Sequence, residues 1–319
     1  MDVNTVYEGI LAGNRRAIAR GLSWIDEGGV RGKELAHRLF THMGKARIIG
    51  ITGAPGVGKS TLVNALALRL RQREHTVGIL AVDPSSPFTG GAILGDRIRM
   101  QESVDDKGVY MRSLASRGHV GGLSRAAFGA ITLLDAAGFD TILVETVGAG
   151  QAEVDIMRYA QTILVVLAPG LGDDIQAIKA GILEIGNVFV VNKSDREGVD
   201  LTVRSLRGLL SLTSEASGWT PPIVKTQADR AMGLDDVVEA VDHHQHHLRQ
   251  HHVLDDLRCQ QAENILKQAL EDQLMLMQSA PGQKALWDET VKRILSGNDA
   301  GSEARRILRE WMGTTVQGD

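Results

Sequence analysis

A short stretch beginning at residue 53 combines glycines, a lysine and a hydroxyl at a spacing suited to phosphate chemistry. Its residues are Gly53, Ala54, Pro55, Gly56, Val57, Gly58, Lys59, Ser60 and Thr61. The first eight match G-x-x-x-x-G-K-[ST], between an apolar run at 47–52 and an amphipathic segment at 60–72. Backbone N–H groups and the helix N-terminus there can hold a phosphate. We expect Lys59 to reach the β- and γ-phosphates and Ser60 to bind Mg²⁺.

A second pattern, N-K-x-D, occupies residues 192–195 after another apolar run. The Asp195 carboxylate can accept from the ring N–H and the exocyclic amino group of guanine together, whereas adenine has no such donor pair. We expect Asn192 to face the imidazole edge of the base and Lys193 to lie over its plane. Thr226, Gln227 and Ala228 follow the next run and either close over the base or form an ordinary strand-end turn.

Acidic residues form a third set of candidates. Asp83 and Glu145 end apolar runs, and Asp96 follows a segment rich in proline and glycine, which predicts a mobile loop. Strand ends of a parallel sheet share one edge, so Asp83 and Glu145 are expected to point to the edge where Ser60 lies, and oxygen ligands of this kind suit Mg²⁺. Turn capping is the alternative for both aspartates.

Glu145 also begins Glu-Thr-Val-Gly, where switches of the P-loop class usually have Asp-x-x-Gly. The Gly148 amide would then contact the last phosphate. No glutamine follows Gly148 directly; Gln151 comes three residues later and either orients water or is a helix-terminal surface residue. The predicted catalytic set is therefore Lys59, Glu145 and Gln151. Because phosphoryl transfer depends on positioning and charge stabilisation, we expect slow hydrolysis until a partner completes the site.

Short apolar runs alternate with longer amphipathic segments from residue 46 to residue 250. The runs are 47–52, 77–82, 109–111, 141–145, 162–167, 188–192 and 223–225, and the expected helices are 60–72, 122–137, 174–184, 202–212 and 234–250. This alternation predicts an α/β fold with a largely parallel sheet. Helical spacing before residue 44 and after residue 250 predicts three parts: a helical extension at 1–44, a nucleotide domain at 45–250 and a helical arm at 251–319.

Composition narrows the class of protein. The formal net charge of −4 gives no support for nucleic-acid binding. The single cysteine, Cys259, fits a reducing compartment, and no apolar run approaches the ~20 residues of a membrane span. The first residues do not resemble a signal sequence. We therefore expect a cytoplasmic protein without a membrane or nucleic-acid partner. The apolar stripes of the arm need burial against the core or another subunit.

Longer blocks resemble the MeaB/ArgK-type P-loop GTPases over nearly the whole chain. These blocks are GAPGVGKST (53–61), VDPSSPFTGGAILGDRIRM (82–100), RSLASRGHVGGLS (112–124), VETVGAGQAE (144–153), GLGDDIQAIKAGILEI (170–185) and NKSD (192–195). The glutamate at 145 is itself a mark of this family. The resemblance implies that Asp83, Asp96 and Glu145 line the Mg²⁺ site and that 82–100 and 146–158 are switches. It also implies a third switch at 168–179 that communicates with the mutase. Where the family commonly has Ile-Lys-Lys-Gly, this chain has Ile178-Lys179-Ala180-Gly181, so of the two lysines only Lys179 carries over.

The same resemblance implies a function. Members serve adenosylcobalamin-dependent acyl-CoA mutases, methylmalonyl-CoA mutase above all, as GTP-dependent chaperones, and their C-terminal arm forms a homodimer. Two alternatives stay open: a nickel metallochaperone GTPase of the hydrogenase or urease type, and a kinase linked to small-molecule transport. Six histidines between 243 and 252 bear on the first. His243, His247 and His251 share helical spacing and either bind a metal or belong to a solvated helix. Arg117-Gly-His119 contacts nucleotide or partner, or forms an exposed turn.

Overall fold

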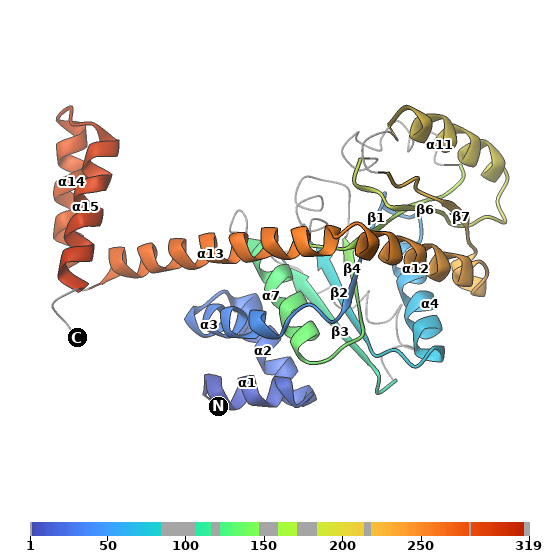
Figure 1. The fold of residues 1–319 in the computed structure, drawn as a ribbon, viewed down its shortest axis with the longest axis horizontal. Helices are drawn as coiled ribbons and strands as arrows, with labels where there is room; N and C mark the ends of the chain where they lie inside the picture. The colour runs from blue at the N-terminus through green and yellow to red at the C-terminus, as the bar shows by residue number, and fades with distance from the viewer. Residues whose placement is uncertain are drawn as a thin grey trace. The chain divides into compact units, whose positions relative to one another are not determined.

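The computed structural model describes residues 2–83, 106–115, 122–146, 159–170, 184–213, 218–280 and 282–315. Within these ranges one sheet holds β1 (Arg47–Thr52), β2 (Val77–Asp83), β3 (Val109–Ala115), β4 (Thr141–Thr146), β5 (Thr162–Leu167), β6 (Val188–Val191) and β7 (Ile223–Lys225). The strand order is β3-β2-β4-β1-β5-β6-β7 and every neighbouring pair is parallel. The predicted α/β class with a parallel sheet is confirmed (Figure 1).

Two apolar clusters, one on each face, hold the sheet between helices. One cluster includes residues of α1 (Val3–Leu11), α2 (Arg15–Glu27), α3 (Val30–Leu39), α7 (Gly122–Ala136) and α11 (Val199–Thr213). The other includes residues of α4 (Lys59–Gln72) and α12 (Leu234–Gln250). The predicted helix at 174–184 falls almost wholly outside the described residues.

Alternation along β4 shows how the sheet sorts its side chains. Ile142 and Val144 belong to the α7 cluster, whereas Leu143 between them belongs to the α4 cluster. Because successive strand residues point to opposite faces, Glu145 is directed toward α4 and Thr146 toward α7. The last two residues of β4 therefore point toward the helix layers on opposite faces of the sheet.

The sheet order identifies the edge where a ligand belongs. Strand β1 is the central strand of the sheet: β2, β3 and β4 lie on one side of it and β5, β6 and β7 on the other, so the strand order reverses at β1. In open parallel sheets such a reversal leaves a crevice at the carboxyl ends of the strands, and ligands bind there. Helix α4 begins at Lys59, seven residues after β1 ends, so its N-terminus follows the carboxyl end of the central strand.

A capping residue begins α2, and the segment that follows the N-terminal helices is anchored to α7. Asn14 Oδ1 accepts the N–H groups of Arg16 and Ala17 at the start of α2. The 3-10 turn η1 (Phe40–His42) follows α3. Asp135 of α7 is buried and accepts N–H groups from the three consecutive residues 44–46 that lead into β1. This carboxylate fixes the point where the N-terminal helices pass into the sheet.

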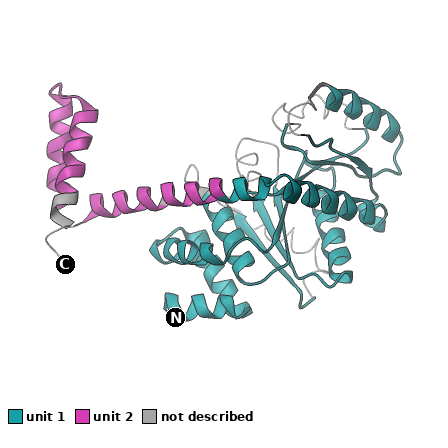
Figure 2. Ribbon diagram, viewed as in Figure 1, with its two compact units in different colours: residues 1–258 teal, residues 259–319 magenta. Residues whose placement is uncertain are grey.

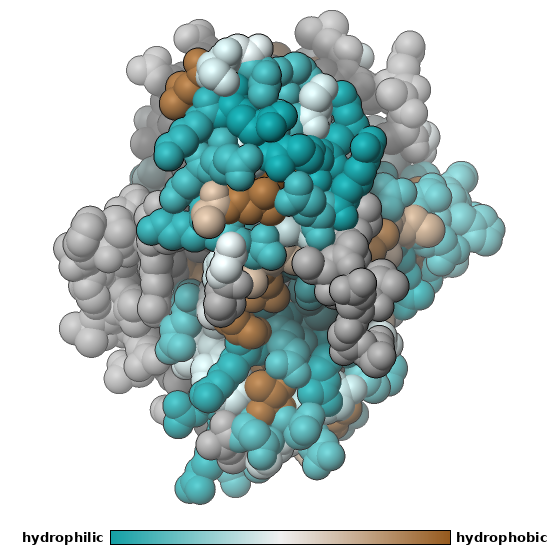
Figure 3. Space-filling model, turned by 90° about the vertical axis from the view of Figure 1, so that its left-hand side faces the viewer, coloured by the Kyte–Doolittle hydropathy of each residue, from teal (hydrophilic) through white to brown (hydrophobic). Residues whose placement is uncertain are grey.

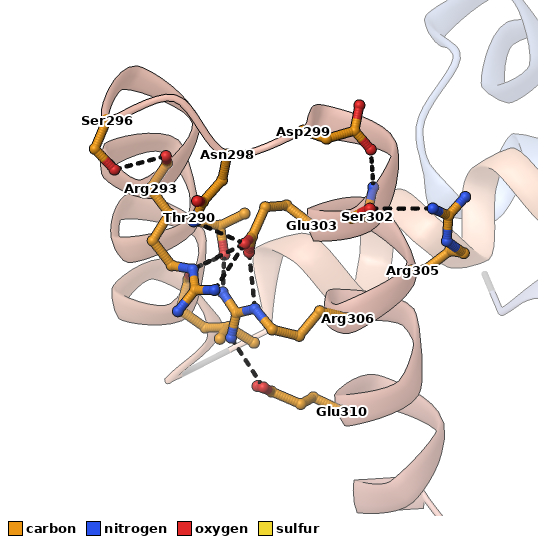
Figure 4. A network of polar contacts seen from close by, with 11 residues as sticks. Thr290, Arg293, Ser296, Asn298, Asp299, Ser302, Glu303, Arg305, Arg306 and Glu310 are labelled. Carbon is orange, nitrogen blue, oxygen red and sulfur yellow. Dashed lines mark hydrogen bonds and ion pairs between the residues drawn. The ribbon is translucent and has the colours of Figure 1, made fainter.

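The chain divides into two compact units, residues 1–258 and 259–319, with the boundary inside helix α13 (Val253–Ser279) (Figure 2). The second unit contains the rest of α13, α14 (Gln283–Leu295) and α15 (Ala300–Thr315). Glu303, 4 % exposed, accepts from Arg293, Asn298 and Arg306, and Arg306 also donates to Thr290 (Figure 4). A charged network therefore joins α14 to α15.

Apolar residues of the second unit remain exposed. They are Leu266, Leu270, Leu274, Met275, Leu276, Trp287, Val291, Ile294, Leu295 and Leu308. On the face drawn in Figure 3, apolar groups in brown lie among hydrophilic residues in teal. None of the helices in the described ranges combines the length and the apolar character that crossing a membrane requires.

Candidate nucleotide-binding site

The loop between β1 and α4 depends on glycine at both ends. Gly53 and Gly58 have φ angles of 146° and 97°, in the region that L side chains rarely adopt. A Cβ on Gly53 would lie 2.2 Å from the Val166 carbonyl oxygen, and one on Gly58 would lie 2.4 Å from Asn192 Nδ2. The loop is therefore pressed against β5 on one side and against the N-K-x-D segment on the other.

Lys59 is buried at the start of α4, and its ammonium lies over the loop. Nζ donates to the carbonyl oxygens of Gly53 at 2.8 Å and Ala54 at 3.0 Å. Carbonyl dipoles stabilise a buried ammonium only partly, and a phosphate oxygen is a stronger charge-assisted acceptor. The lysine is therefore held at the place where the phosphate-binding role requires a cation.

The Asn192 side chain joins three segments of the site. Its Nδ2 donates to the Val57 carbonyl at 3.0 Å, and its Oδ1 accepts from Thr226 Oγ1 and the Ala228 N–H, each at 3.1 Å. Sequence reasoning assigned this amide to the base alone and missed the link. Since an amide nitrogen carries two hydrogens, one N–H is left for a base.

Lys193 adds a second link between the same segments. Its Nζ donates to the Gly56 carbonyl at 2.5 Å, and its backbone has a φ of 55°, which is uncommon outside glycine. The Ser194 N–H donates to the Thr226 carbonyl at 3.0 Å, and Asp195 is exposed. The structure thus brings the phosphate loop, residues 192–195 and residues 226–228 together at one edge, with Gln227 between the two bonded residues.

Ser60 and Glu145 meet at the same edge. The Ser60 hydroxyl donates to Glu145 Oε1 at 2.6 Å, and Glu145 is 2 % exposed. Glu145 lies beside Ile51 in the β1–β4 register, so the two strand ends bring the carboxylate to the first turn of α4. A hydroxyl and a buried carboxylate are oxygen ligands of the type that Mg²⁺ prefers, so this pair fits the ion.

The remaining predicted ligands and switches are described only in part. Asp83 ends β2, directly after Val82, which is in register with Thr146, but its side chain lies outside the described residues. Asp96, Gly148 and Gln151 lie outside them as well, as do Lys179, Arg117 and His119. Of the four predicted Mg²⁺ ligands, the structure therefore places the side chains of Ser60 and Glu145.

The histidine run belongs to α12 and the first residues after it, and the interpretation as a solvated helix was wrong for one member. His244 is 2 % exposed: its Nδ1 lies 2.9 Å from Thr162 Oγ1, and its ring packs on Trp219. Burial lowers the pKa of His244 to about 4, with a smaller contribution from His247. His243, by contrast, is exposed, and the described ranges hold no group of three His, Cys, Asp or Glu side chains suited to a metal ion.

A parallel sheet whose central strand runs into G-x-x-x-x-G-K-S, bonded to N-K-x-D, defines a P-loop nucleotide-binding protein. Residues 18–282 match the family model described as methylmalonyl Co-A mutase-associated GTPase MeaB. The chain belongs to this family and is a GTPase.

Individual relatives agree with the family model. The chain is 41 % identical to a putative GTPase of Pyrococcus abyssi, over 98 % of this chain and 97 % of that protein. It is 32 % identical to the GTPase ArgK of Escherichia coli over 82 % of each. A crystal structure titled LAO/AO transport system kinase has the same fold, with a TM-score of 0.69 and 22 % identity over 98 % of this chain and 97 % of that one.

Proposed function

We propose that this GTPase is the chaperone of an adenosylcobalamin-dependent acyl-CoA mutase, methylmalonyl-CoA mutase first. GTP binding and hydrolysis would control cofactor loading and the exclusion or release of damaged cofactor. Membership of a family whose model is named for association with that mutase carries this proposal. The intact phosphate loop and its bonds to residues 192–195 support the nucleotide half of it.

Each part of the site would have a distinct task. The amides of residues 53–61 and the Lys59 ammonium hold the phosphates, Gly148 contacts the last of them, and Asp195 selects guanine. Residues 226–228 close over the base. Mg²⁺, held by Ser60, Asp83, Asp96 and Glu145, would neutralise developing charge on the phosphates. Lys59 and Glu145 stabilise charge, and Gln151 is the candidate that orients water.

Two features of the chain support partners: the position of the candidate water-orienting residue and the exposed apolar residues of the second unit. A site whose candidate water-orienting residue is displaced from Gly148 should be slow alone and faster with its mutase. The exposed apolar residues of α13–α15 would be covered by a second copy, which makes the arm a homodimer interface. A cytoplasmic location completes the proposal, consistent with the exposed Cys259 thiol.

The test is GTP turnover with and without purified methylmalonyl-CoA mutase and adenosylcobalamin. We expect the mutase to accelerate turnover and GTP to be required for cofactor transfer. Unchanged turnover would remove the mutase from the proposal and leave the GTPase intact. Transfer of the γ-phosphate to a carrier protein instead of water would favour the kinase. Nickel bound by the purified protein at equimolar level would favour the metallochaperone.

Guanine selection has its own test, since Asp195 pairs with two donors of the base. Asp195→Asn presents a donor where the carboxylate accepted, and xanthine has an acceptor where guanine has its amino group. The variant should therefore have a lower affinity for GTP and a higher affinity for xanthosine triphosphate. Calorimetry of both nucleotides on both proteins measures this exchange. Equal affinity of the wild-type protein for ATP and GTP would contradict guanine selection altogether.

A further inference from the structure

Helices α4 and α12 lie side by side on one face of the sheet, and each of them follows a loop of the nucleotide site (Figure 1). Helix α4 begins at Lys59, directly after the phosphate loop. Helix α12 begins at Leu234, directly after the loop at 226–233, whose first residues bond to the Asn192 side chain. The position of one helix relative to the other therefore sets the separation between the two ends of the site.

The loop at 226–233 is tied to the start of α12. Gln227 and Met232 each donate their N–H to the carbonyl of the other at 3.1 Å, which closes the loop on itself. A Cβ on Gly233 would lie 2.2 Å from the Lys225 carbonyl oxygen, so the residue before α12 is packed against the residue before the loop. A shift of the start of α12 would therefore move the whole loop with it.

Asp235, in the first turn of α12, joins the two helices through charge. Its carboxylate accepts from Arg69 Nε at 2.7 Å, from Arg69 Nη2, and from Arg73 Nη2 at 3.0 Å. Arg69 belongs to α4 and Arg73 is the residue that caps its C-terminus. The pKa of Asp235 is lowered, first by the hydrogen bond from Arg69, so its carboxylate is charged at neutral pH. Two cations of one helix therefore hold one anion of the other.

This contact differs from an ordinary surface ion pair. Isolated exposed pairs contribute little, whereas a guanidinium that binds both oxygens of a carboxylate fixes its orientation as well as its distance. The Asp235 side chain is 47 % exposed, so salt should weaken the contact. Asp236, the next residue, is exposed and makes no ion pair within the part of the chain that the structure describes. Of these two neighbouring carboxylates, Asp235 is the one held against α4.

We propose that Asp235 is a positioning residue for the nucleotide: by binding Arg69 and Arg73 it holds the start of α12, and with it residues 226–228, at a fixed distance from the phosphate loop. The inference rests on the nucleotide site proposed above. Phosphates and base are two parts of one ligand, so a site whose two ends are already correctly spaced binds it without a further cost in ordering. Loss of these bonds should weaken binding of the whole nucleotide and leave binding of a phosphate chain alone unchanged.

Asp235→Asn keeps the shape of the side chain and removes its charge. Calorimetry should show the affinities for GDP and for a non-hydrolysable GTP analogue each falling about fivefold, the effect of losing a partly exposed ion-pair network. Affinity for inorganic tripolyphosphate, which occupies the phosphate loop alone, should stay at the wild-type value. The KM for GTP should rise by a similar factor, with kcat changed less. The ratio between wild-type and variant nucleotide affinities should approach one at high salt.

Asp236→Asn is the matched control. It removes the same charge from the same helical turn, so it should have the same general effect on α12 and leave nucleotide affinity unchanged. An equal loss of nucleotide affinity in Asp236→Asn and Asp235→Asn would overturn the proposal, and so would unchanged nucleotide affinity in Asp235→Asn. A loss in Asp235→Asn that is equal for GDP and tripolyphosphate would show damage to α4 itself and overturn it as well.

Arg69→Met, alone and combined with Asp235→Asn, completes a double-mutant cycle. Because both changes break the same bonds, the double variant should bind GDP no more weakly than the weaker of the two single variants. Losses that add would show that the two residues act independently, which contradicts the proposal.

Lys59→Ala separates this inference from the site on which it rests. Removing the phosphate-binding ammonium should weaken tripolyphosphate and both nucleotides whether or not Asp235 acts as proposed. Wild-type binding by Lys59→Ala would overturn the site assignment and the inference together. Weakened binding by Lys59→Ala combined with unaltered binding by Asp235→Asn would overturn the inference alone.

Discussion

At the scale of single residues, the glutamate at 145 is explained by where β4 ends. Its carboxylate reaches the Ser60 hydroxyl at 2.6 Å while its own strand neighbour is Ile51 of β1. An aspartate would be one methylene shorter from the same backbone position. The extra reach brings the carboxylate to the first turn of α4, where the predicted ion would lie.

Glu145→Ala should therefore separate hydrolysis from binding. GDP affinity should stay close to wild type, because Lys59 and the loop amides still hold the β-phosphate. GTP turnover should fall by roughly 10²–10³-fold, the range typical of losing one charge-stabilising contact. Measuring turnover and GDP binding on the same preparations, with Glu145→Asp as the conservative comparison, checks this. Wild-type turnover in Glu145→Ala would make Glu145 a structural strand-end residue.

His244 makes the stability of the protein depend on pH, and the direction of that dependence follows from its lowered pKa. Burial of the imidazole disfavours its charged form, and His244 Nδ1 lies 2.9 Å from Thr162 Oγ1, which accepts from Gln245 Nε2. The folded pKa of about 4 lies below the unfolded value of 6.5, so the unfolded state binds the proton more readily. The contribution of a neutral, buried His244 to the free energy of unfolding is therefore fully present above pH 6.5 and is lost as the pH falls toward 4.

The loss should approach roughly 3 kcal/mol in the free energy of unfolding between those pH values. Urea unfolding at several pH values measures it. His244→Gln should flatten the profile over this window, whereas His243→Gln, at an exposed position on the same helix, should leave it unchanged. A profile that stays steep in His244→Gln would assign the pH dependence to other groups.

At the scale of elements, the site is a junction of three loops, and Asn192 holds it together. Asn192→Ala would leave the Val57 carbonyl and the Ala228 N–H without their partner. We expect a loss of about 2–3 kcal/mol in stability and a clear loss of GTP affinity, since both loops would shift. Thermal unfolding and calorimetry measure the two effects.

Asn187→Ala is the comparison at the opposite edge of the sheet, where Asn187 Oδ1 accepts the Ile163 N–H at 2.7 Å. It should destabilise the protein and leave GTP affinity unchanged. If Asn192→Ala behaves in the same way, the amide is a structural group and the junction does not determine nucleotide binding.

The sequence predicted these elements well where a periodic pattern existed. All seven strands were expected, because each is an apolar run between turn residues, and 47–52, 162–167 and 223–225 agree to the residue. Strand β3 was expected to end at Met111 but continues to Ala115, because Arg112 and Ser113 interrupt its apolar pattern while it still pairs with β2.

Contacts between distant segments could not be predicted in this way. Motif letters placed Asn192 and Ser60 at the site, but not the bond from Asn192 to Val57 or from Ser60 to Glu145. His244 was missed because one buried histidine among six looks the same in sequence. Its burial depends on Thr162 and Trp219, which are far from it along the chain.

At the scale of the whole molecule, the boundary at residue 258 separates the predicted nucleotide-binding residues from the apolar residues that we expect to form an interface. All predicted nucleotide-binding residues precede this boundary, and the exposed apolar residues of α13–α15 follow it. Arg258, the last residue of the first unit, donates to the Gly44 carbonyl at 2.6 Å. The first turns of α13 therefore belong to the first compact unit, and the boundary at residue 250 between nucleotide domain and arm stays a prediction.

Two truncations test this division. A chain ending at Arg258 should bind GTP like the full chain and be a monomer by light scattering, because it keeps the Gly44 contact and loses the apolar stripe. A chain ending at Val253 should also be a monomer, but about 1 kcal/mol less stable, since the Gly44 carbonyl loses its charged donor. The full chain should be a dimer at micromolar concentration. A dimeric 1–258 chain, or a monomeric full chain, would contradict assembly through the arm, since the apolar residues of α13–α15 would then need another partner.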